Sequence, residues 1–504
     1  MRRGFFHFAA FAIAALAIGC SSNGASPIPP DRFGAFQADG SSRGKIKHVV
    51  IIVQENRSFD NLFDCFPGTD CVKTAAAPAP RPLPTTKSNP CPTVPTPSPG
   101  PTPTPIKLRF NQKLTTYDID HTYCAAFVQD YDGGKLDGFW WNIAGFPNGL
   151  ATANAYDVVG EKYIQPYWDL AQQYVLGDRT FPTQASGSFT AHQDLIRGDT
   201  DVLPHESVID YPFNHENDAP LWGCDDRPDS VTSLITSKRV YLYNQGPFPC
   251  FSYRTIRDSL DAKGVTWKYY APAFPNNGGQ YWNAFDAIDA VRHDKTEWPN
   301  KPRFTCVKSC VSWPQTNVLC DVAGSTVSPC PAPNPPGDVE LPAVSFVIPD
   351  ALDSDHGLGP TQKDNGPDWV ASVVNAIGKS PYWNSTAIFI MWDEWGGFYD
   401  HVPPPQLDYQ GLGFRVPLIV VSPYAKKGYV DHTQYEYGSL LKFVEYTFNL
   451  PSLGTTDVRA NAVGNAFNFK QAPRKFVTIK LLNKGHDSRY FLMRPPSGLP
   501  VDSE

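Results

Sequence analysis

Two pairs of adjacent oxygen-bearing side chains are the part of this 504-residue sequence best suited to chemistry. Glu55-Asn56 follows the apolar run KHVVIIV, and Asp393-Glu394 follows the apolar run TAIFIMW. Carboxylate and amide oxygens are ligands of hard divalent cations, and carboxylates that gather repel one another unless a cation or a proton intervenes. Polar residues also fill turns and cap helices at strand ends. The residue types alone therefore leave two interpretations open, a metal site and ordinary turns.

The segments before these pairs have the composition of buried strands. Continuous apolar, β-branched runs predict strands that are covered on both faces. Six segments are expected as strands: 47–53, 239–243, 265–270, 344–348, 386–392 and 416–421. Segments 368–377 and 437–448 have the apolar spacing of helices. This alternation predicts an α/β fold with a mostly parallel central sheet flanked by helices. Ligands of such sheets bind beyond the carboxyl ends of the strands, which is where both pairs lie.

The first twenty residues have the order of an export signal. Residues 1–3 carry positive charge, residues 4–19 are almost wholly apolar, and Cys20 follows. The apolar run is shorter than the roughly 20 residues that span a membrane. Residues 1–20 are therefore expected to be a signal peptide with a lipobox-like end. Cleavage there would leave a lipidated Cys20 in the periplasm or cell envelope, and ordinary cleavage nearby would leave a secreted protein.

Cysteine usage and charge narrow the class of protein. Beyond Cys20 there are ten cysteines, an even number that predicts disulfides in an oxidising compartment. A zinc site at Cys306, Cys310, Cys320 and Cys330 is the alternative, although the spacing is loose and no histidine pair accompanies it. The net charge is −7 and no contiguous basic block occurs. Nucleic-acid binding by a polycationic face is therefore excluded.

Composition also divides the chain into parts. Residues 21–44 are expected to form a flexible tether and residues 45–453 the main domain. Within that domain, the Pro/Thr/Ser/Ala-rich tract 75–105 is expected to be an extended surface insertion. Residues 454–504 are expected to be a C-terminal extension packed on the domain. No pattern in the sequence predicts the oligomeric state.

Two long blocks make the chain recognisable. HVVIIVQENRSFDNLF at residues 48–63 and MWDEWGGFYDHVPPP at residues 391–405 resemble the two signature blocks of the bacterial phosphoesterase family. That family contains non-specific phospholipases C and acid phosphatases, and it belongs to the alkaline-phosphatase-like superfamily. The resemblance extends from about Lys45 to Leu453. It implies an alkaline-phosphatase-like α/β fold with long loops, and metal-dependent hydrolysis of phosphate esters.

The resemblance also implies roles for individual residues. Glu55, Asn56, Asp393 and Glu394 match the family's ligands of a catalytic metal, so one divalent metal ion is the expected cofactor. Its identity does not follow from the sequence. The glycines that come next, Gly396-Gly397, would allow backbone to approach a ligand closely.

The family's nucleophile is a serine or threonine in the block that here reads TFPTQASGS, residues 180–188. Thr183 is the expected counterpart. The residues after it depart from the family pattern, which leaves Ser186 and Ser188 as rivals. A hydroxyl that only caps a helix is the structural alternative for each of them.

Four histidines are candidates for proton transfer or for a cationic clamp on phosphate. The resemblance favours His121 and His356 as active-site histidines. His192 could serve either in the site or in the structure. His401, which follows Asp400, is expected to brace its loop together with that residue.

Together these residues predict attack by Thr183 on phosphorus and a covalent phospho-Thr intermediate. The expected activity is phospholipase C-type cleavage of phosphodiesters, with a phosphate-ester substrate that includes phospholipid. Two alternatives stay open: an acid phosphatase acting on monoesters, and a non-catalytic lipid-anchored binding protein. The aromatic residues 139–141 either line an apolar groove or belong to the core.

Overall fold

A computed structural model describes residues 41–78, 104–114, 117–146, 149–213, 222–272, 281–298, 309–324, 330, 340–357 and 365–497. The expected signal peptide, the lipobox-like Cys20, the expected tether as far as residue 40 and most of the Pro-rich insertion lie outside these residues. The two ends of that insertion pair with each other, because β2 (Thr74–Ala75) and β3 (Ile106–Lys107) form a short antiparallel ladder.

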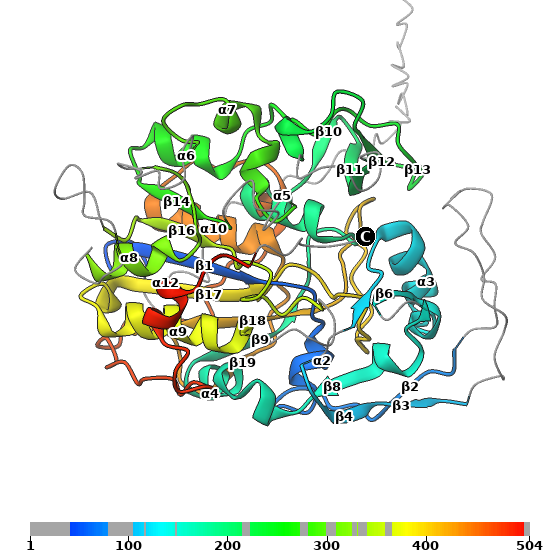
Figure 1. Ribbon diagram of the computed structural model, residues 1–504, viewed down its shortest axis with the longest axis horizontal. Coiled ribbons are helices and arrows are strands. Elements are labelled where there is room, and N and C mark those ends of the chain that lie inside the picture. Colours follow the sequence, from blue (N-terminus) through cyan, green and yellow to red (C-terminus); the bar gives the residue numbers. More distant parts are fainter. Residues whose placement is uncertain are drawn as a thin grey trace, which may run out of the picture.

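An eight-stranded sheet forms the centre of the described chain (Figure 1). Its β1 strand pairs in parallel with β16 on one side and with β17 on the other. Only β18 runs antiparallel to its neighbours. In spatial order the strands are β15 (Cys310–Ser312), β14 (Trp267–Tyr270), β16 (Val344–Val347), β1 (His48–Gln54), β17 (Thr386–Trp392), β18 (Val416–Val421), β9 (Val175–Thr180) and β19 (Tyr429–Asp431). The prediction of a mostly parallel sheet in an α/β fold is confirmed.

Five of the six expected strands lie in this sheet, and the sixth lies in another sheet. Segment 239–243 contributes only β13 (Tyr241–Leu242), which belongs to a separate four-stranded antiparallel sheet. The other strands of that sheet are β10 (Asp201–Leu203), β11 (Glu206–Phe213) and β12 (Val231–Thr236). Strand β9 of the eight-stranded sheet is not predicted by the sequence pattern, because Asp178 and Arg179 interrupt its apolar run. Burial in this case is decided by the neighbouring strands β18 and β19 and not by the local pattern.

Helices cover both faces of the central sheet. In Figure 1, α9 and α12 lie on one side of the sheet, and α5, α6 and α10 lie on the other. The longer helices are α4 (Gln165–Gln173), α5 (Ser188–Arg197), α9 (Gly366–Lys379) and α10 (Tyr437–Phe448). The shorter ones are α2 (Phe59–Phe63), α3 (Val128–Tyr131), α6 (Ile256–Ala262), α7 (Asp289–Arg292), α8 (Asn317–Ala323), α11 (Thr456–Arg459) and α12 (Ser488–Met493). Five short strands complete the description of the strands: β4 (Arg109–Gln112), β5 (Asp118–Ile119), β6 (Ile143–Phe146), β7 (Gly149–Leu150) and β8 (Asp157–Val159). The expected helices 368–377 and 437–448 are α9 and α10.

A second apolar cluster, rich in aromatic rings, includes residues of the loop that follows β17. It contains Phe139, Trp395 and Phe414, which are all fully buried. Trp141 is also buried. Of the two interpretations of the aromatic residues 139–141, the structure supports the core and not an open groove.

Disulfides are present, as the cysteine count predicts. The structure pairs Cys65 with Cys71, Cys224 with Cys250, and Cys320 with Cys330. Cys124 and Cys310 are disulfide-bonded as well. The zinc alternative is therefore wrong, because three of its four proposed ligands have no free thiolate.

Residues at both ends of the main domain are buried against it. Ser42, placed in the expected tether, is buried and its hydroxyl lies 2.9 Å from Thr447 Oγ1. The tether therefore ends before this residue. Beyond residue 453, the side chains of Phe467, Ile479 and Phe491 are buried in the main core. No helix in the described residues is long and apolar enough to cross a membrane.

Candidate active site

The carboxyl ends of β1 and β17 bring the two oxygen-bearing pairs together. Asn56 N and Glu394 N both donate to Asp393 Oδ1, at 2.9 and 2.8 Å. Glu55, Asp393 and Glu394 have no solvent exposure, and Asn56 is 4% exposed. Asn56 adopts a left-handed conformation with φ of +61°, which asparagine tolerates better than most residues. The four expected metal ligands therefore converge in one buried place.

Gly396 and Gly397 allow close approach between backbone segments. Both have positive φ, and a Cβ on Gly396 would lie 2.1 Å from the carbonyl oxygen of Asn56. A Cβ on Gly397 would lie 2.4 Å from a side-chain carbon of Ile119. The glycines thus allow the loop after β17 to approach the loop after β1 and the strand β5 closely.

Helix α5 adds a histidine to the cluster. His192 Nε2 lies 3.2 Å from Glu55 Oε1 and 3.9 Å from Asp393 Oδ2. One ligand atom from each of these three buried residues lies within 4.8 Å of the others, the spacing of a metal site. His192, whose role the sequence left open, is therefore part of the site.

The donor set fits a divalent cation. Burial raises the pKa of the Asp393 carboxyl well above its ordinary value, and the charge and hydrogen bond of Glu55 raise this pKa further. Asn56 Oδ1 is buried and receives no hydrogen bond from the described residues. Crowded buried carboxylates beside an unused amide oxygen are the environment that a hard cation stabilises.

His121 reaches the same cluster from the segment after β5. Its Nδ1 lies 2.8 Å from the carbonyl oxygen of Ile119, which can only accept, so Nδ1 carries the hydrogen. Its Nε2 lies 3.1 Å from Asn56 Nδ2, 3.1 Å from Tyr211 Oη and 3.7 Å from Glu394 Oε1. The Nε2 atom of His121 therefore faces the expected metal ligands Asn56 and Glu394.

His356 is buried further along the same side of the site. Its Nε2 lies 4.0 Å from Asp118 Oδ1, and its ring lies 5.7 Å from that of Trp282. The Trp282 carbonyl accepts a hydrogen bond from Tyr269 Oη at 2.6 Å, and Tyr269 Oη is 3.5 Å from His192 Nδ1. These contacts connect His356 to the cluster through two intermediate residues.

The three candidate hydroxyls occupy different environments. Thr183 Oγ1 accepts from Tyr437 N at 3.2 Å and lies 3.5 Å from Glu436 Oε2, so it caps the start of α10. Ser186 Oγ accepts from Asp210 N at 2.8 Å and donates to the carboxylate of that residue at 3.2 Å. Both hydroxyls are therefore used in structural hydrogen bonds.

Ser188 differs from both. It is the first residue of α5 and is fully buried, and its side chain lies near the Asp393 carboxyl, whose pKa burial raises well above its ordinary value. Ser188 Oγ forms no hydrogen bond with any residue that the structure describes. Its backbone N donates to Tyr211 Oη at 3.1 Å, which links it to His121. Because Ser188 and His192 are four residues apart, both project from one side of α5 toward the expected metal ligands.

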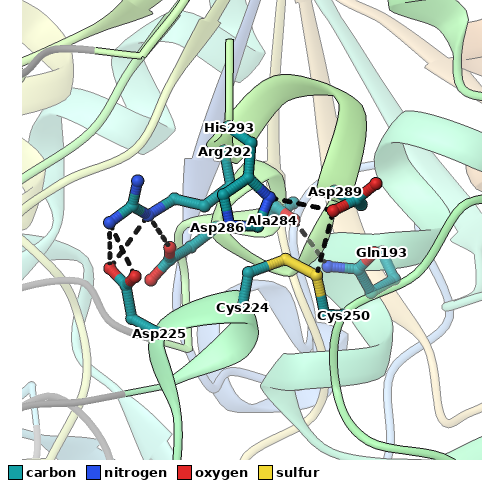
Figure 2. The surroundings of a disulfide bond; sticks show 9 residues. All are labelled: Gln193, Cys224, Asp225, Cys250, Ala284, Asp286, Asp289, Arg292 and His293. Carbon is teal, nitrogen blue, oxygen red and sulfur yellow. Dashed lines mark hydrogen bonds and ion pairs between the residues drawn. A yellow bond between two sulfur atoms is a disulfide. The ribbon is translucent and has the colours of Figure 1, made fainter. Parts of the chain in front are cut away.

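A disulfide lies close to the segment that holds α5 in place. Gln193 Nε2 donates to the Ala284 carbonyl at 2.8 Å, and Tyr253 Oη donates to Gln193 Oε1 at 2.5 Å. Figure 2 shows the first of these bonds beside the Cys224–Cys250 disulfide. Cys250 is three residues before Tyr253, so the disulfide restrains the segment whose Tyr253 side chain contacts α5.

The similarity of this chain to known proteins shows the family to which it belongs. Residues 46–451 match the model of the Phosphoesterase family. The protein belongs to this family. As a member of the family it is a phosphoric ester hydrolase.

Relatives of this phosphoesterase carry the name phospholipase C. It is 26% identical to phospholipase C A of Mycobacterium tuberculosis, over 89% of this chain and 82% of the relative. It is 23% identical to the non-hemolytic phospholipase C of Pseudomonas aeruginosa, over 84% of this chain and 57% of the relative. A solved structure in the alkaline phosphatase superfamily, from Vibrio parahaemolyticus, is 10% identical over 82% of this chain and 70% of its own, with a TM-score of 0.33.

A buried ionic network clamps the two signature loops of this phosphoesterase together. Arg415 donates to Asp400 Oδ1 and to Asp60 Oδ1, both at 2.8 Å, and it has no solvent exposure. His401 Nδ1 lies 2.7 Å from Asp60 Oδ2. The expected brace at His401 exists, but its partner is Asp60 and not Asp400. Because Arg415 already occupies the space between the two carboxylates, these acidic residues form an ion-pair network and not a second cation site.

This clamp gives a prediction about stability. Arg415→Met should lower the free energy of unfolding by about 3–5 kcal/mol, because it leaves two buried carboxylates without their cation. Urea denaturation measures this change. Arg227→Met is the matched control, since Arg227 forms only an exposed 3.6 Å pair with Asp229 and should cost less than about 1 kcal/mol. Equal stability of the two variants would show that Arg415 does not hold the two loops together.

Three residues that lie at this phosphoesterase site were left open or not named from the sequence: Ser188, His192 and Tyr211. His192 and Ser188 share the i, i+4 spacing of one helix face, a signal that becomes useful only once the helix is known to begin at Ser188. Tyr211 lies on β11, in the separate sheet, and no sequence pattern connects it to the signature blocks.

Proposed function

We propose that this phosphoesterase cleaves phosphate esters by attack of Ser188 Oγ on phosphorus, at a divalent metal held by Glu55, Asn56, Asp393 and Glu394. The observation that carries the assignment is the position of Ser188. Its buried hydroxyl lies beside Asp393 without a structural hydrogen bond, whereas the Thr183 hydroxyl caps α10. Thr183 is the alternative nucleophile, as the family resemblance implies.

The position of Ser188 at the start of α5 suits a nucleophile. The amino end of a helix carries partial positive charge, which stabilises a developing alkoxide and the negative charge of a phosphoryl group. The cation, when bound, would lower the pKa of the hydroxyl and neutralise charge on a phosphoryl oxygen. Ser188 Oγ then forms a bond to phosphorus as the bond to the leaving alcohol breaks, which gives a phosphoserine.

His121 is placed to move the proton. Its Nδ1 is held by the Ile119 carbonyl, so Nε2 is the nitrogen that can take up and release a proton. Neutral Nε2 would take up the proton that Ser188 Oγ loses and donate it to the departing alcohol oxygen. In the second step it would accept a proton from the water that hydrolyses the phosphoserine and return this proton to Ser188 Oγ. His356, beside Asp118, is the second candidate for a contact with the substrate.

We further propose phospholipase C-type cleavage of phosphodiesters. Support comes from the names of the relatives, which span two bacterial genera. An acid phosphatase acting on monoesters is the second candidate. Membership of the Phosphoesterase family argues against the non-catalytic binding protein. Export of the protein is proposed as well, and the disulfides are consistent with an oxidising compartment.

Turnover of two soluble substrates tests the proposed activity. We expect the purified protein to hydrolyse p-nitrophenylphosphocholine faster than p-nitrophenyl phosphate, and to lose both activities in a chelator until a divalent metal is restored. Faster turnover of the monoester would establish the phosphatase instead. Turnover that no chelator affects would contradict the metal site.

A further inference from the structure

A pocket on the α9 side of the central sheet is unrelated to the residues of the active site. It has a volume of about 390 Å³ and lies between α9 and the C-terminal extension. Ile479, which is buried, and Leu481 supply apolar surface, and three lysines surround it: Lys379, Lys480 and Lys484. Asn375 pairs with both backbone groups of Ile479, at 2.9 Å each, so the extension is held firmly against α9.

The charges around this pocket are positive and unbalanced. Lys379, Lys480 and Lys484 are exposed, and none forms an ion pair with any residue that the structure describes. Asp487 is the acidic residue in the pocket wall, and its carboxylate caps the first turn of α12 by accepting from two backbone N–H groups. The pocket therefore presents a net positive charge to solvent.

The surrounding extension has the same character. Between residues 470 and 494 one residue is acidic, Asp487, and seven are basic: Lys470, Arg474, Lys475, Lys480, Lys484, Arg489 and Arg494. The whole chain, by contrast, carries a net charge of −7. The basic residues are spread along the segment, so no contiguous block reveals them in the sequence.

Apolar side chains are exposed within the same segment. Val477 is 56% exposed, Leu482 37% and Met493 61%. These are three of the eight large hydrophobic side chains that are exposed in the described part of the chain. Exposed apolar residues among lysines and arginines are typical of surfaces that lie on anionic membranes, where the cations meet headgroups and the apolar side chains enter the interface.

We propose that this C-terminal basic surface, formed by Lys379 and residues 474–493, binds membranes that contain anionic phospholipid. The lysine-rimmed pocket accepts an anionic headgroup, and Val477 and Leu482 enter the interface beside it. This proposal does not rest on the proposed catalytic function. The extension also contacts the loop that carries His356, because Arg494 donates to Asp350 at 2.8 Å and to Asp353 at 2.7 Å.

Sedimentation with lipid vesicles tests this proposal. The full chain is used with Cys20→Ser, so that lipidation cannot anchor it. We expect binding to vesicles of phosphatidylcholine mixed with phosphatidylglycerol, and little binding to vesicles of phosphatidylcholine alone. Each lysine near an anionic surface contributes about a five-fold increase in partitioning, so the triple variant K379Q/K480Q/K484Q should bind about 100-fold more weakly. Binding should also weaken as salt is added.

A second triple variant, K238Q/K263Q/K295Q, is the matched control. It removes the same charge from three exposed lysines on other elements, and it should change binding by less than about five-fold. Turnover of a soluble p-nitrophenyl substrate, followed in parallel, keeps loss of catalysis separate from loss of binding. Absence of binding to the anionic vesicles would overturn the proposal, as would equal weakening by the two triple variants. Equal binding to both vesicle types would also overturn it.

Discussion

Ser188→Ala should lower kcat by about 10⁴-fold or more, because it removes the atom that attacks phosphorus. The fold should be unaffected, since Ser188 Oγ forms no structural hydrogen bond within the described residues. Thr183→Val should have the opposite profile. It removes a cap at the start of α10 and should cost about 1 kcal/mol of stability, with less than about ten-fold loss of kcat. Steady-state turnover of the preferred p-nitrophenyl substrate and urea denaturation separate the two profiles.

The covalent intermediate provides an independent measurement. The reaction is quenched with acid during turnover, and the protein is digested. Mass spectrometry should then find a phosphopeptide with the phosphate on Ser188. Ser186→Ala is the control within the same segment, because its hydroxyl bonds to Asp210 and it should retain the phosphorylated intermediate. Phosphate on Thr183, or an active Ser188→Ala variant, would restore Thr183 as the nucleophile.

Asp393→Asn should abolish metal binding and lower kcat by about 10³-fold or more. Neutralising this carboxylate removes a charged ligand and leaves the substrate and nucleophile without the cation, which is worth several kcal/mol in such reactions. Metal analysis should find no ion in the variant. In the presence of chelator the variant should be at least as stable as the wild type, because burial and the charge of Glu55 disfavour an ionised Asp393 in the metal-free protein.

A carboxylate outside the cluster provides the control for this substitution. Asp178 is also buried and its partner is His432, at 2.8 Å. Asp178→Asn should retain the metal and most of the activity. If Asp393→Asn keeps its metal, or if both variants lose it equally, the assignment of Asp393 as a ligand is incorrect.

The two signature loops show how much of the site the sequence determines. Glu55-Asn56 and Asp393-Glu394 follow apolar runs that behave as buried strands, and adjacent parallel strands place their carboxyl ends at one edge of a sheet. The convergence of these four residues therefore follows from local composition and one rule of sheet topology. The disulfides follow in the same way, from an even cysteine count.

Elements whose burial depends on distant neighbours were harder to predict. Strand β9 contains Asp178 and Arg179, and it joins the eight-stranded sheet only because β18 and β19 pair with it. Segment 239–243 has the local pattern of a strand, yet it joins the small antiparallel sheet. In both cases the partner strand, which local sequence does not specify, decided the outcome.

The sequence by itself determined the fold class, the four expected metal ligands and the importance of the hydroxyl-rich block 180–188. Only the tertiary structure distinguished the hydroxyls of that block. Three residues within six positions have similar chemistry, and they differ in what packs against them: α10 against Thr183, Asp210 against Ser186, and the metal-ligand cluster against Ser188. Those neighbours come from segments between 24 and 254 residues away, so their identity depends on how the helices dock and not on any local pattern.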